Sequence, residues 1–434
     1  MNRAPYYIIA GIDFGTAFTK CMVRNTATNE LKAVTYNLRG KTKYLLPSLL
    51  HLEKKGIVHP LHSEAKPGGM TIPYLKMALV AKCRGEANHW QRILNQANGR
   101  ELPYDIPPIV EGLVGFYLLC LIGRIVEFVR ENWPDFGSNP DDQIFYNMSL
   151  PADDMQQEAV LGSFKKCLYW AVSSYDRDDL PDYDALTQEI LNHPKRDGCN
   201  FLGEVTANVM SYRKERGGRP GLYLFVDVGA GTVDLSVFLY PDERYFTPMQ
   251  TYTAAVVSMT GSSQIELRAF ERFLGDKDSP EVLWKIRQCK EGNSDYRMFT
   301  PLIEKAKTSL RADLDASLRA TLGVARTNHV PNEFKTMNVL MGGGGWCDIP
   351  YKTEVESVTA DFHLRPELLP LPKPQNSGDI WPGLPDAPKR FSVALGLSYP
   401  PWEWPDEIYP DDLNPLPRTP PRPRPINPAS ESDG

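Results

Sequence analysis

The feature that most constrains this chain is an aspartate and glycine turn between two apolar runs, which occurs twice. Residues 222–240 read LYLFVDVGAGTVDLSVFLY, and residues 8–23 read IIAGIDFGTAFTKCMV. Each copy predicts two buried strands joined by a tight turn. The backbone N–H groups of such a turn bind phosphate, and the carboxylate beside them can hold a metal ion through water. Two copies facing each other across a cleft would clamp a polyphosphate and its Mg²⁺ from both sides.

Glycines have a specific duty in these turns. Gly15, Gly229 and Gly231 allow backbone angles closed to other residues, or let the main chain approach phosphate oxygens without a Cβ in the way. One such turn is a weak signal, because an Asp-x-Gly-x-Gly segment between strands is often only a hairpin. The pair is a stronger signal, and a third glycine turn follows an apolar run in NVLMGGGGWCDIP at 338–350.

The composition describes a chain that can fold around a large core. Its 434 residues are 42% hydrophobic, a length and content that favour two or more domains. The net charge is −6, with acidic and basic residues mixed along the sequence. Contacts with a nucleic-acid backbone require clustered Lys and Arg, so we expect no nucleic-acid binding.

The cysteines and apolar runs favour a cytoplasmic protein. The seven cysteines are scattered without a CxxC pair, which argues against a zinc cage, an iron–sulfur site or a disulfide framework. No apolar segment of signal-peptide length precedes Asp13. The longest apolar run, GLVGFYLLCLIG at 112–123, is shorter than a membrane span, so we expect a buried helix and no membrane association.

Hydrophobic periodicity predicts strands and helices in alternation, as in an α/β protein. In the first half we expect a strand meander from YYIIAGIDFG, a helical piece at 72–83, a helix at about 107–131, a strand at 143–151 and a helix at 152–174. A polar loop at about 176–198 and a helix at 201–215 should follow. In the second half we expect the second strand pair, helices at about 262–274 and 301–319, a strand at 337–341 and a helix after the glycine turn. The proline-rich segment 366–388 is expected to be irregular, and a short helix at 390–398 follows. The remainder has too many prolines to join a sheet.

Three of these segments resemble a known family. GIDFGTAFT, FVDVGAGTVDLS and VLMGGGGWCDIP are similar to the phosphate-1, phosphate-2 and adenosine motifs of the actin-like ATPase superfamily, most of all to the nucleotide-binding domain of DnaK-type heat-shock chaperones. Further stretches follow in the family's order, namely LLPSLL, YLKMAL, NMSLPADDMQQEA, GEVTANVMSY, IEKAKTSL and VALGLS. The resemblance implies an α/β fold of two ribonuclease-H-like lobes around a nucleotide cleft.

The resemblance also implies a division of the chain. Residues 1–205 would form a first lobe with the phosphate-1 motif, and residues 206–390 a second lobe with the phosphate-2 and adenosine motifs. Residues 391–400 would return as a helix to the first lobe. Residues 401–434 would be a proline-rich, disordered tail, since they contain no nucleotide motif.

The family pattern assigns the two turns to a Mg²⁺ ion and the phosphates of ATP. Asp13 and Asp227 would hold the water shell of the metal. The phosphate contacts would come from Gly15, Thr16, Gly229, Gly231 and Thr232. Phosphoryl transfer is mostly positioning and charge neutralisation, which is the chemistry that such a set of groups supplies.

Three further residues match catalytic positions of the family. Lys76 falls where the chaperones keep a lysine beside the γ-phosphate, and Glu204 where they keep a carboxylate that positions the metal and the attacking water. Asp234 falls where a further carboxylate lies near that water. Without the flanking motifs, Lys76 reads equally as a solvated helix lysine, and Glu204 as an N-terminal helix carboxylate favoured by the helix dipole.

The nucleoside positions are the remaining part of the assignment. Glu304 and Lys307 match a pair that contacts the nucleoside, although their i, i+3 spacing also fits an ordinary surface ion pair. Gly342 and Gly343 match the adenosine turn. Trp346 stands where the family has other residues, and it would either stack on the base or cover a hydrophobic edge.

The chain departs from the family pattern in several places. Ala17 replaces a second hydroxyl and Ala230 replaces the middle glycine of the second turn, which implies fewer phosphate contacts and slow hydrolysis. Thr308 replaces an arginine that flanks the base, so base preference stays open. Only about 35 residues follow the ATPase-like part, too few for the peptide-binding domain of the chaperones.

These observations favour a cytoplasmic Mg²⁺- and ATP-dependent conformational switch, with a protein partner held through the proline-rich tail. The alternatives are a filament-forming ATPase of the actin-like kind and an interaction module that binds nucleotide without turning it over. A small-molecule kinase on the same fold is a further alternative, but no aspartate stands out as its catalytic base. Fold analogy ranks these functions and does not decide among them.

Overall fold

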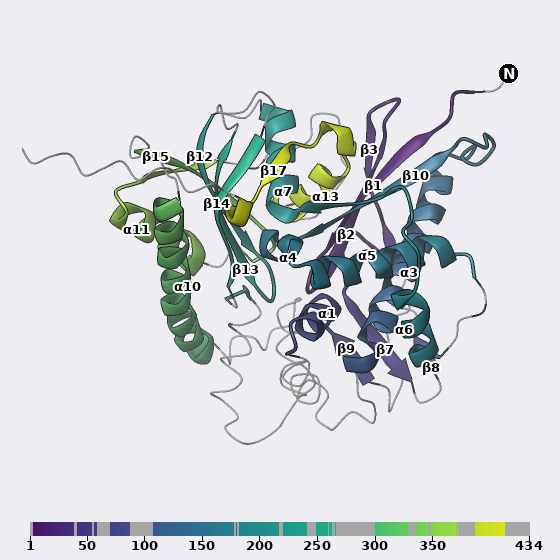
Figure 1. Cartoon of the computed structure of the whole chain (residues 1–434), viewed down its shortest axis with the longest axis horizontal. Coiled ribbons are helices and arrows are strands. Elements are labelled where there is room, and N and C mark those ends of the chain that lie inside the picture. The colour runs from purple at the N-terminus through teal and green to yellow at the C-terminus, as the bar shows by residue number, and fades with distance from the viewer. Residues whose placement is uncertain are drawn as a thin grey trace, which may run out of the picture.

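The computed structural model describes residues 3–38, 41–53, 56–58, 70–86, 107–177, 179, 182–216, 220–240, 249–258, 260–262, 265, 300–328, 335–345, 349–369, 371 and 387–412. Within these ranges the chain is a mixed α/β protein with two large sheets of mixed strand direction. The two sheets lie side by side in Figure 1, and α7 (Glu204–Arg216) and α13 (Ser392–Leu397) lie between them.

The first sheet combines an antiparallel meander with two parallel strands. Its order is β11-β10-β1-β2-β3, with β6 paired to the end of β2. In β1 and β2 the strands run antiparallel, whereas β10 and β11 add on the other side of β1 in parallel. The strands are β1 (Tyr7–Phe14), β2 (Phe18–Asn25), β3 (Glu30–Ala33), β6 (Leu46–Pro47), β10 (Gln143–Leu150) and β11 (Cys199–Gly203).

The second sheet repeats this topology. Its order is β16-β15-β12-β13-β14-β17, in which β12, β13 and β14 form the antiparallel meander and β15 and β16 add in parallel beside β12. A short sixth strand, β17, pairs in parallel with β14 at the opposite edge. The strands are β12 (Gly221–Val228), β13 (Val233–Tyr240), β14 (Met249–Ser258), β15 (Thr336–Gly342), β16 (Arg365–Leu369) and β17 (Asp406–Ile408).

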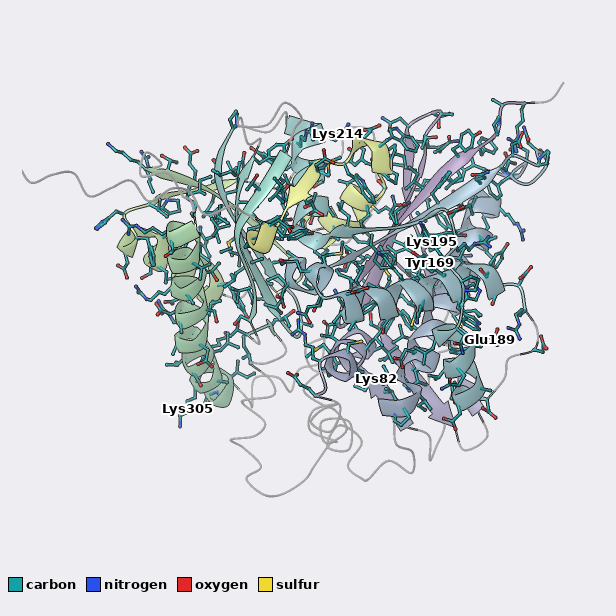
Figure 2. The ribbon with its side chains drawn as sticks, in the orientation of Figure 1. Lys82, Tyr169, Glu189, Lys195, Lys214 and Lys305 are labelled. Atoms are coloured by element: carbon teal, nitrogen blue, oxygen red, sulfur yellow. The ribbon has the colours of Figure 1, made fainter. Side chains whose placement is uncertain are left out.

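Helices cover the outer faces of both sheets. Charged side chains such as Lys305 point away from the body along these helices (Figure 2). The helices of the first half are α1 (Leu75–Cys83), the 3₁₀ turn η1 (Pro107–Ile109), α3 (Val110–Asn132), α4 (Ala152–Gln156), α5 (Glu158–Ser174) and α6 (Tyr183–Leu191), of which α1 and α6 pack on α3 and α5. On the second sheet lie α10 (Thr300–Asn328) and α11 (Ile349–Asp361). Two small sheets, β4 (Tyr36–Leu38) with β5 (Lys41–Lys43) and β8 (Gly56–Val58) with β7 (Leu49–Glu53) and β9 (Met70–Pro73), complete the first half.

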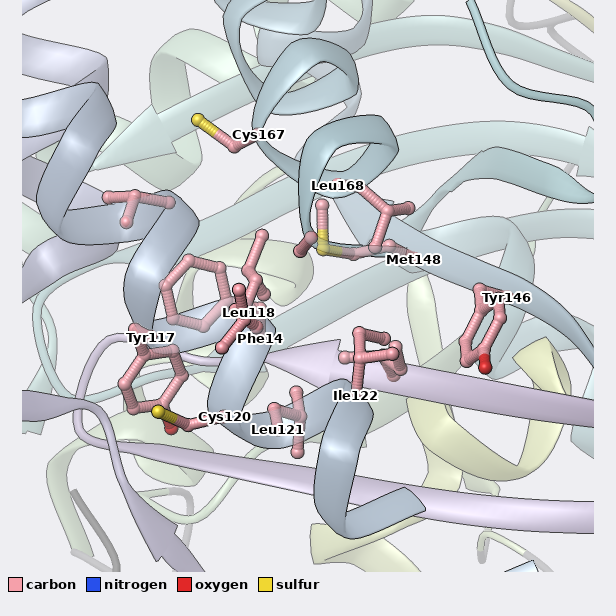
Figure 3. Close-up of a cluster of buried hydrophobic side chains, with 14 of the residues drawn as sticks. Phe14, Tyr117, Leu118, Cys120, Leu121, Ile122, Tyr146, Met148, Cys167 and Leu168 are labelled. Carbon is pink, nitrogen blue, oxygen red and sulfur yellow. The ribbon is translucent and has the colours of Figure 1, made fainter. Parts of the chain in front are cut away.

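The first core holds the end of β1 in place. Phe14, the last residue of β1, is buried among α3 and α5, and its ring stacks on Tyr117 with centroids 5.3 Å apart (Figure 3 labels both). It also forms a T-shaped pair with Phe164, with centroids 6.2 Å apart. Aromatic side chains contribute large buried area and fix geometry through such pairs. The residue before Phe14 is Asp13, so this packing fixes the aspartate of the first turn.

Strands β12 and β13 of the second meander are largely apolar because both of their faces are buried. Successive side chains of a strand point to opposite faces. Along β12, Leu224 packs in the core with Leu310 of α10, whereas Phe225 packs in a second cluster with Val209 of α7. The long apolar run of the sequence therefore reflects burial on both faces.

The helix pair α7 and α13 joins the two halves. Gly396 of α13 lies so close to α7 that an added Cβ would be 1.7 Å from the carbonyl oxygen of Ala207. On its other side α13 rests on β1, where a Cβ at Gly11 would lie 2.3 Å from the carbonyl oxygen of Ala394. These glycines allow backbone to pack on backbone. The short α12 (Ala387–Arg390) precedes α13.

Two sequence expectations for the middle of the chain are wrong. The polar segment 176–198 contains α6, whose N-cap Asp182 accepts a hydrogen bond from the Ala185 N–H at 2.9 Å. The expected helix at 201–215 begins only at Glu204, because the residues before it form the edge strand β11. The expected helix at 262–274 lies largely outside the described residues.

The expectations for the C-terminal part also need correction. The segment expected to be irregular from 366 contains β16, which tolerates Pro366 because it is an edge strand. The tail expected to be disordered from 401 packs on the body as far as Asp412, through the 3₁₀ turns η3 (Pro401–Glu403) and η4 (Pro410–Asp412) and through β17. The reason is that the prolines flank β17, while Asp406 to Ile408 pair with β14. Residues 413–434 lie outside the described residues.

Helix α3 is the apolar helix that the sequence predicts. By length and composition it could cross a membrane, and it is the one such helix found in the described part of the chain. Its most apolar window is 78% buried inside the fold. That is the position of a core helix.

Candidate functional site

The two aspartate turns occupy equivalent places in the two sheets. Asp13 is the second-to-last residue of β1, beside the turn into β2, and Asp227 is the second-to-last residue of β12, beside the turn into β13. Across the first hairpin, Asp13 is paired with Lys20. Across the second hairpin, Asp227 is paired with another acid, Asp234.

The two turns meet each other and helix α1. An added Cβ at Gly231 of the second turn would lie 2.5 Å from Met77 Sδ of α1 and 3.2 Å from Thr16 Cγ2 of the first turn. The second turn is closed by a hydrogen bond from the Gly229 N–H to the Thr232 carbonyl at 3.0 Å. The structure therefore brings together both predicted phosphate turns, including Gly15 and Thr16, although they lie far apart in the sequence.

Lys76 enters the site from the first turn of α1. Tyr74, two residues before Lys76, has a left-handed backbone (φ 60°, ψ 39°) where the chain passes from β9 into the helix. Such a conformation is uncommon for a residue with a Cβ and redirects the chain sharply. The Lys76 side chain is buried, and its Nζ donates a hydrogen bond to Oε1 of Glu204. Glu204 is the first residue of α7. The solvated-lysine alternative for Lys76 is therefore wrong.

Three buried carboxylates converge at this point. One oxygen each of Glu204, Asp227 and Asp234 lies within 4.8 Å of the others, and all three residues are at least nine-tenths buried. Asp234 Oδ1 has no hydrogen-bond partner among the described residues. A set of buried carboxylate oxygens, one of them unpartnered, fits a hard divalent cation such as Mg²⁺.

The site has more carboxylates than ammonium groups, so a bound cation would neutralise its excess of negative charge. The carboxylates of Asp13, Glu204, Asp227 and Asp234 face two ammonium groups, Lys20 on Asp13 and Lys76 on Glu204. Buried charges are costly unless they are paired. Among the described residues, no lysine forms an ion pair with either carboxylate of the second hairpin, Asp227 or Asp234.

Burial and mutual repulsion make these acids hard to ionise. Burial raises the pKa of Asp227 to about 7, with further contributions from the charges of Glu204 and Asp13. Burial, then the charges of Glu204 and Asp227, raises the pKa of Asp234 well above its usual range. Burial also raises the pKa of Asp13, although Lys20 offsets part of this effect. Perturbed acids of this kind cluster at functional sites.

Lys76 shows the opposite balance. Burial acts to lower the pKa of Lys76, but the charge and hydrogen bond of Glu204, together with Asp234 and Asp13, outweigh burial and raise the pKa. Lys76 is therefore held as a cation.

The third glycine turn lies against Asp227. Gly343 has φ +82°, and an added Cβ would lie 2.4 Å from Asp227 Oδ1 and 2.3 Å from the carbonyl oxygen of Val228. Only glycine fits there, both in backbone angle and in space. Gly342 ends β15 beside Phe225, with the place for its Cβ 3.5 Å from Asp227 Oδ1. Trp346 lies outside the described residues.

Glu304 and Lys307 are placed differently from the other predicted site residues. They lie in the first part of α10, and Lys307 Nζ donates to Glu304 Oε1 at 3.0 Å. The Glu304 side chain is 62% exposed. Neither makes a hydrogen bond or ion pair with the carboxylate cluster among the described residues, and the pair has the geometry of the surface ion pair that the sequence left as an alternative.

Lys20 is a residue of the candidate site that the sequence reasoning missed. The sequence does distinguish this residue, because Lys20 is the one charged residue between the first turn and Val23. The other residues of that segment are apolar or carry a hydroxyl. The role of Lys20 became visible only from the strand register, which sets it opposite Asp13 and lets Nζ bond Asp13 Oδ2. Comparison with protein-family models and with curated proteins gives no match for this chain.

Proposed function

We propose that this protein is a Mg²⁺- and ATP-binding ATPase of the actin-like superfamily, closest to the nucleotide-binding domain of DnaK-type chaperones, and that it acts as a slow, nucleotide-driven switch for a protein partner in the cytoplasm. One observation carries the proposal. Two hairpins at equivalent places in two repeated sheets point their aspartates, Asp13 and Asp227, at one buried cluster of acids and lysines. Nucleotide-clamping sites need such opposed turns.

The fold supports this proposal through its repetition. Each large sheet has the strand order expected of a ribonuclease-H-like lobe, with an antiparallel meander followed by two parallel strands. The helix pair α7 and α13 crosses between the sheets, with Gly396 against Ala207. A crossing of this kind gives two lobes a pivot on which they can close around a ligand.

The donors of the site fit a Mg²⁺ ion bound with ATP. Asp13, Glu204, Asp227 and Asp234 would hold it, largely through its water shell. When bound, the ion supplies positive charge to the phosphates and orders the water around them. This arrangement would explain why Asp234 Oδ1 has no hydrogen-bond partner in the part of the chain that the structure describes.

The chain's own groups supply positioning. Lys76, kept protonated by Glu204, would hold a terminal phosphate oxygen, and Lys20 is a second cation at the first turn. Thr16 and Thr232 present hydroxyls next to backbone N–H groups of the turns. The carboxylate oxygens of Glu204 and Asp234 would accept hydrogen bonds from the attacking water and orient it toward the phosphate. Proximity and charge placement are the main sources of catalysis in this reaction class.

An interaction module that binds nucleotide without turnover is the second candidate. Ala17 and Ala230 stand where the family has a hydroxyl and a glycine, so two phosphate contacts of the family are weakened or lost. The two functions share the site and differ only in whether phosphate is released. A partner held through the proline-rich tail is part of either proposal.

Phosphate release by the purified full chain tests the function. With ATP and Mg²⁺ we expect slow but continuous release that stops when Mg²⁺ is chelated, and competition by ADP. A parallel titration with GTP and CTP decides base preference. Binding without release would favour the interaction module, and absence of any nucleotide binding would contradict both.

A further inference from the structure

We propose that Glu407, on the C-terminal strand β17, is a positioning residue that fixes the first turn of α7 and thereby sets Glu204 in the site. The inference rests on the proposed function, because it explains how Glu204 is held for that reaction. Glu407 lies outside every segment that the sequence motifs single out. It touches neither the carboxylate cluster nor the phosphate turns among the described residues, so any effect on turnover must pass through α7.

Strand β17 brings Glu407 to the base of α7. It pairs in parallel with β14, which sets Glu407 opposite Gln250. The Tyr409 ring stacks on the buried Tyr252 ring of β14, with centroids 5.1 Å apart and planes 3° apart. This stack fixes the strand on the sheet edge, so the carboxylate of Glu407 has a defined place.

The Glu407 carboxylate collects three hydroxyl donors. Oε1 accepts hydrogen bonds from Thr206 Oγ1 of α7 and from Tyr252 OH, the latter at 3.3 Å, and Oε2 accepts one from Tyr409 OH at 3.0 Å. Thr206 Oγ1 and Tyr252 OH are themselves 2.6 Å apart. Thr206 and Tyr252 are fully buried. Removing such an acceptor leaves buried hydroxyls without their partner, which is costly.

This network holds the turn of α7 that bears Glu204. Residues two apart in an α-helix point about 200° away from each other. Glu204 therefore points toward Lys76, while Thr206 points the opposite way toward Glu407. The carboxylate also lies at the positive end of the helix, since a Cβ on Gly203 would be 3.0 Å from Glu407 Oε1. A negative charge there stabilises the helix start.

The same C-terminal segment offers a matched control at the other end of α7. Lys214, near the C-terminal end of the helix, forms an ion pair with Glu403 (Figure 2 labels Lys214). Both partners are about one-third exposed, so the pair is worth little. Glu403 and Glu407 thus join the same segment to the same helix, but only Glu407 contacts the turn beside Glu204.

The test compares Glu407→Leu, Glu407→Gln and Thr206→Val with Glu403→Leu in the full chain. Hydrogen exchange of the backbone amides of residues 203–208 is measured without nucleotide, and phosphate release and ATP affinity are measured with Mg²⁺. For Glu407→Leu we expect exchange at 203–208 to rise about tenfold and turnover to fall about tenfold, with ATP affinity within about threefold of the wild type. Glu407→Gln, which keeps an acceptor, should recover part of both losses, and Glu403→Leu should change neither.

The outcomes separate the inference from the proposed function. Turnover of Glu407→Leu within twofold of the wild type would overturn the positioning role, even if the variant is less stable. If Glu407→Leu does not fold, Thr206→Val removes the same hydrogen bond from the helix side at nearly constant shape and decides the question. A wild-type protein without phosphate release would contradict the proposed ATPase, and exchange at 203–208 would then decide alone whether Glu407 holds the turn.

Discussion

The two aspartate hairpins have the same place in two sheets of the same strand order, yet they differ in what faces the aspartate. In the first hairpin the cross-strand partner of Asp13 is Lys20, and the two side chains form an ion pair. In the second, the partner of Asp227 is Asp234. Opposite charges across a strand pair stabilise it, and like charges directly opposite destabilise it.

The difference shows that the first hairpin is neutral by itself, whereas the second depends on charge from elsewhere. Lys76 lowers the cost of the second hairpin's acids through its charge, but its hydrogen bond goes to Glu204, and Asp234 Oδ1 has no hydrogen-bond partner in the described part of the chain. A buried pair of like charges is a cost that folding alone does not explain. We infer that the second hairpin is built for a ligand cation, and that the first is built for the anion that accompanies it.

The largest expected effect of breaking this arrangement is on turnover. Glu204→Gln keeps the size of the side chain but loses the charge that holds Lys76 and orients water, so phosphate release should fall roughly ten- to a thousandfold while ATP still binds. The matched control is Glu111→Gln. Buried Glu111 of α3 pairs with Lys82, which lies on α1 as Lys76 does, and this pair is away from the carboxylate cluster. Equal losses of turnover in the two variants would mean that α1 needs both pairs only for stability.

A second prediction concerns β17, the short strand that extends the second sheet at the edge beside β14. A chain ending after Pro400 loses β17 and the stack of Tyr409 on Tyr252, and we expect its free energy of unfolding to fall by on the order of 2 to 4 kcal/mol. A chain ending after Asp412 keeps the strand and should unfold as the full protein does. Denaturant unfolding of both truncations measures this, and equal stability of the two would show that β17 contributes nothing to the second sheet.

The pH dependence of stability sharpens the contrast between the hairpins. Burial raises the pKa of Asp227 from 3.8 to about 7, so between these values the folded metal-free protein binds more protons than the unfolded chain. The stability that Asp227 contributes through this bound proton is fully present below pH 3.8 and is lost as the pH rises through about 7. We expect a loss on the order of 2 kcal/mol across this window, reduced in Asp227→Asn and by saturating Mg²⁺. Unfolding curves from pH 4 to 8 that show no such loss would contradict the buried-acid description.

The smallest expected effect is at the neutral hairpin. Lys20→Met leaves Asp13 without its partner and adds negative charge to the site, so Mg²⁺ affinity without nucleotide should rise up to about tenfold, and ATP affinity without Mg²⁺ should fall. Lys32→Met on β3, which removes a partly exposed lysine paired with Glu30, is the control in the same sheet. Calorimetric titration of Mg²⁺ measures the change, and a lower Mg²⁺ affinity in Lys20→Met would show that Lys20 supports the metal site.

The sequence predicted the elements whose local signal agrees with their final environment. The structure confirms both aspartate hairpins, the strand expected at 143–151 as β10, and the helix expected at about 107–131 as α3, within a few residues at their ends. Their side chains are buried on one or both faces, so periodicity and burial carry the same information.

The elements that the sequence did not predict depend on tertiary pairing. Strand β17 is three residues long, with Asp406 and Glu407 in it, and nothing in such a segment favours a strand until β14 offers its edge. Strand β11 is likewise an edge strand, held in part by the hydrogen bond from Asn200 Nδ2 to Asn147 Oδ1 at 3.0 Å. Helix α6 is polar and short, so its apolar stripe was too weak to recognise.

The residues of the candidate site likewise fall into those that the local sequence predicts and those that depend on tertiary pairing. Asp13, Asp227 and the glycine turns were predicted because each lies in a continuous motif, and Lys76 and Glu204 because their flanking order resembles a family. Lys20 was missed because its pairing with Asp13 depends on the register across the hairpin. Residue spacing does not show which side chains face each other until the turn length is known.

The central claim is that both hairpins act on one Mg²⁺–ATP ligand, and calorimetric titration of ATP with Mg²⁺ or with a chelator tests it most directly. For the wild type we expect ATP affinity to depend strongly on Mg²⁺. Asp13→Asn and Asp227→Asn should each weaken Mg²⁺-dependent binding by on the order of 1 to 3 kcal/mol, since each removes one charge-assisted contact. Unchanged affinity and unchanged Mg²⁺ dependence in both variants would contradict the account.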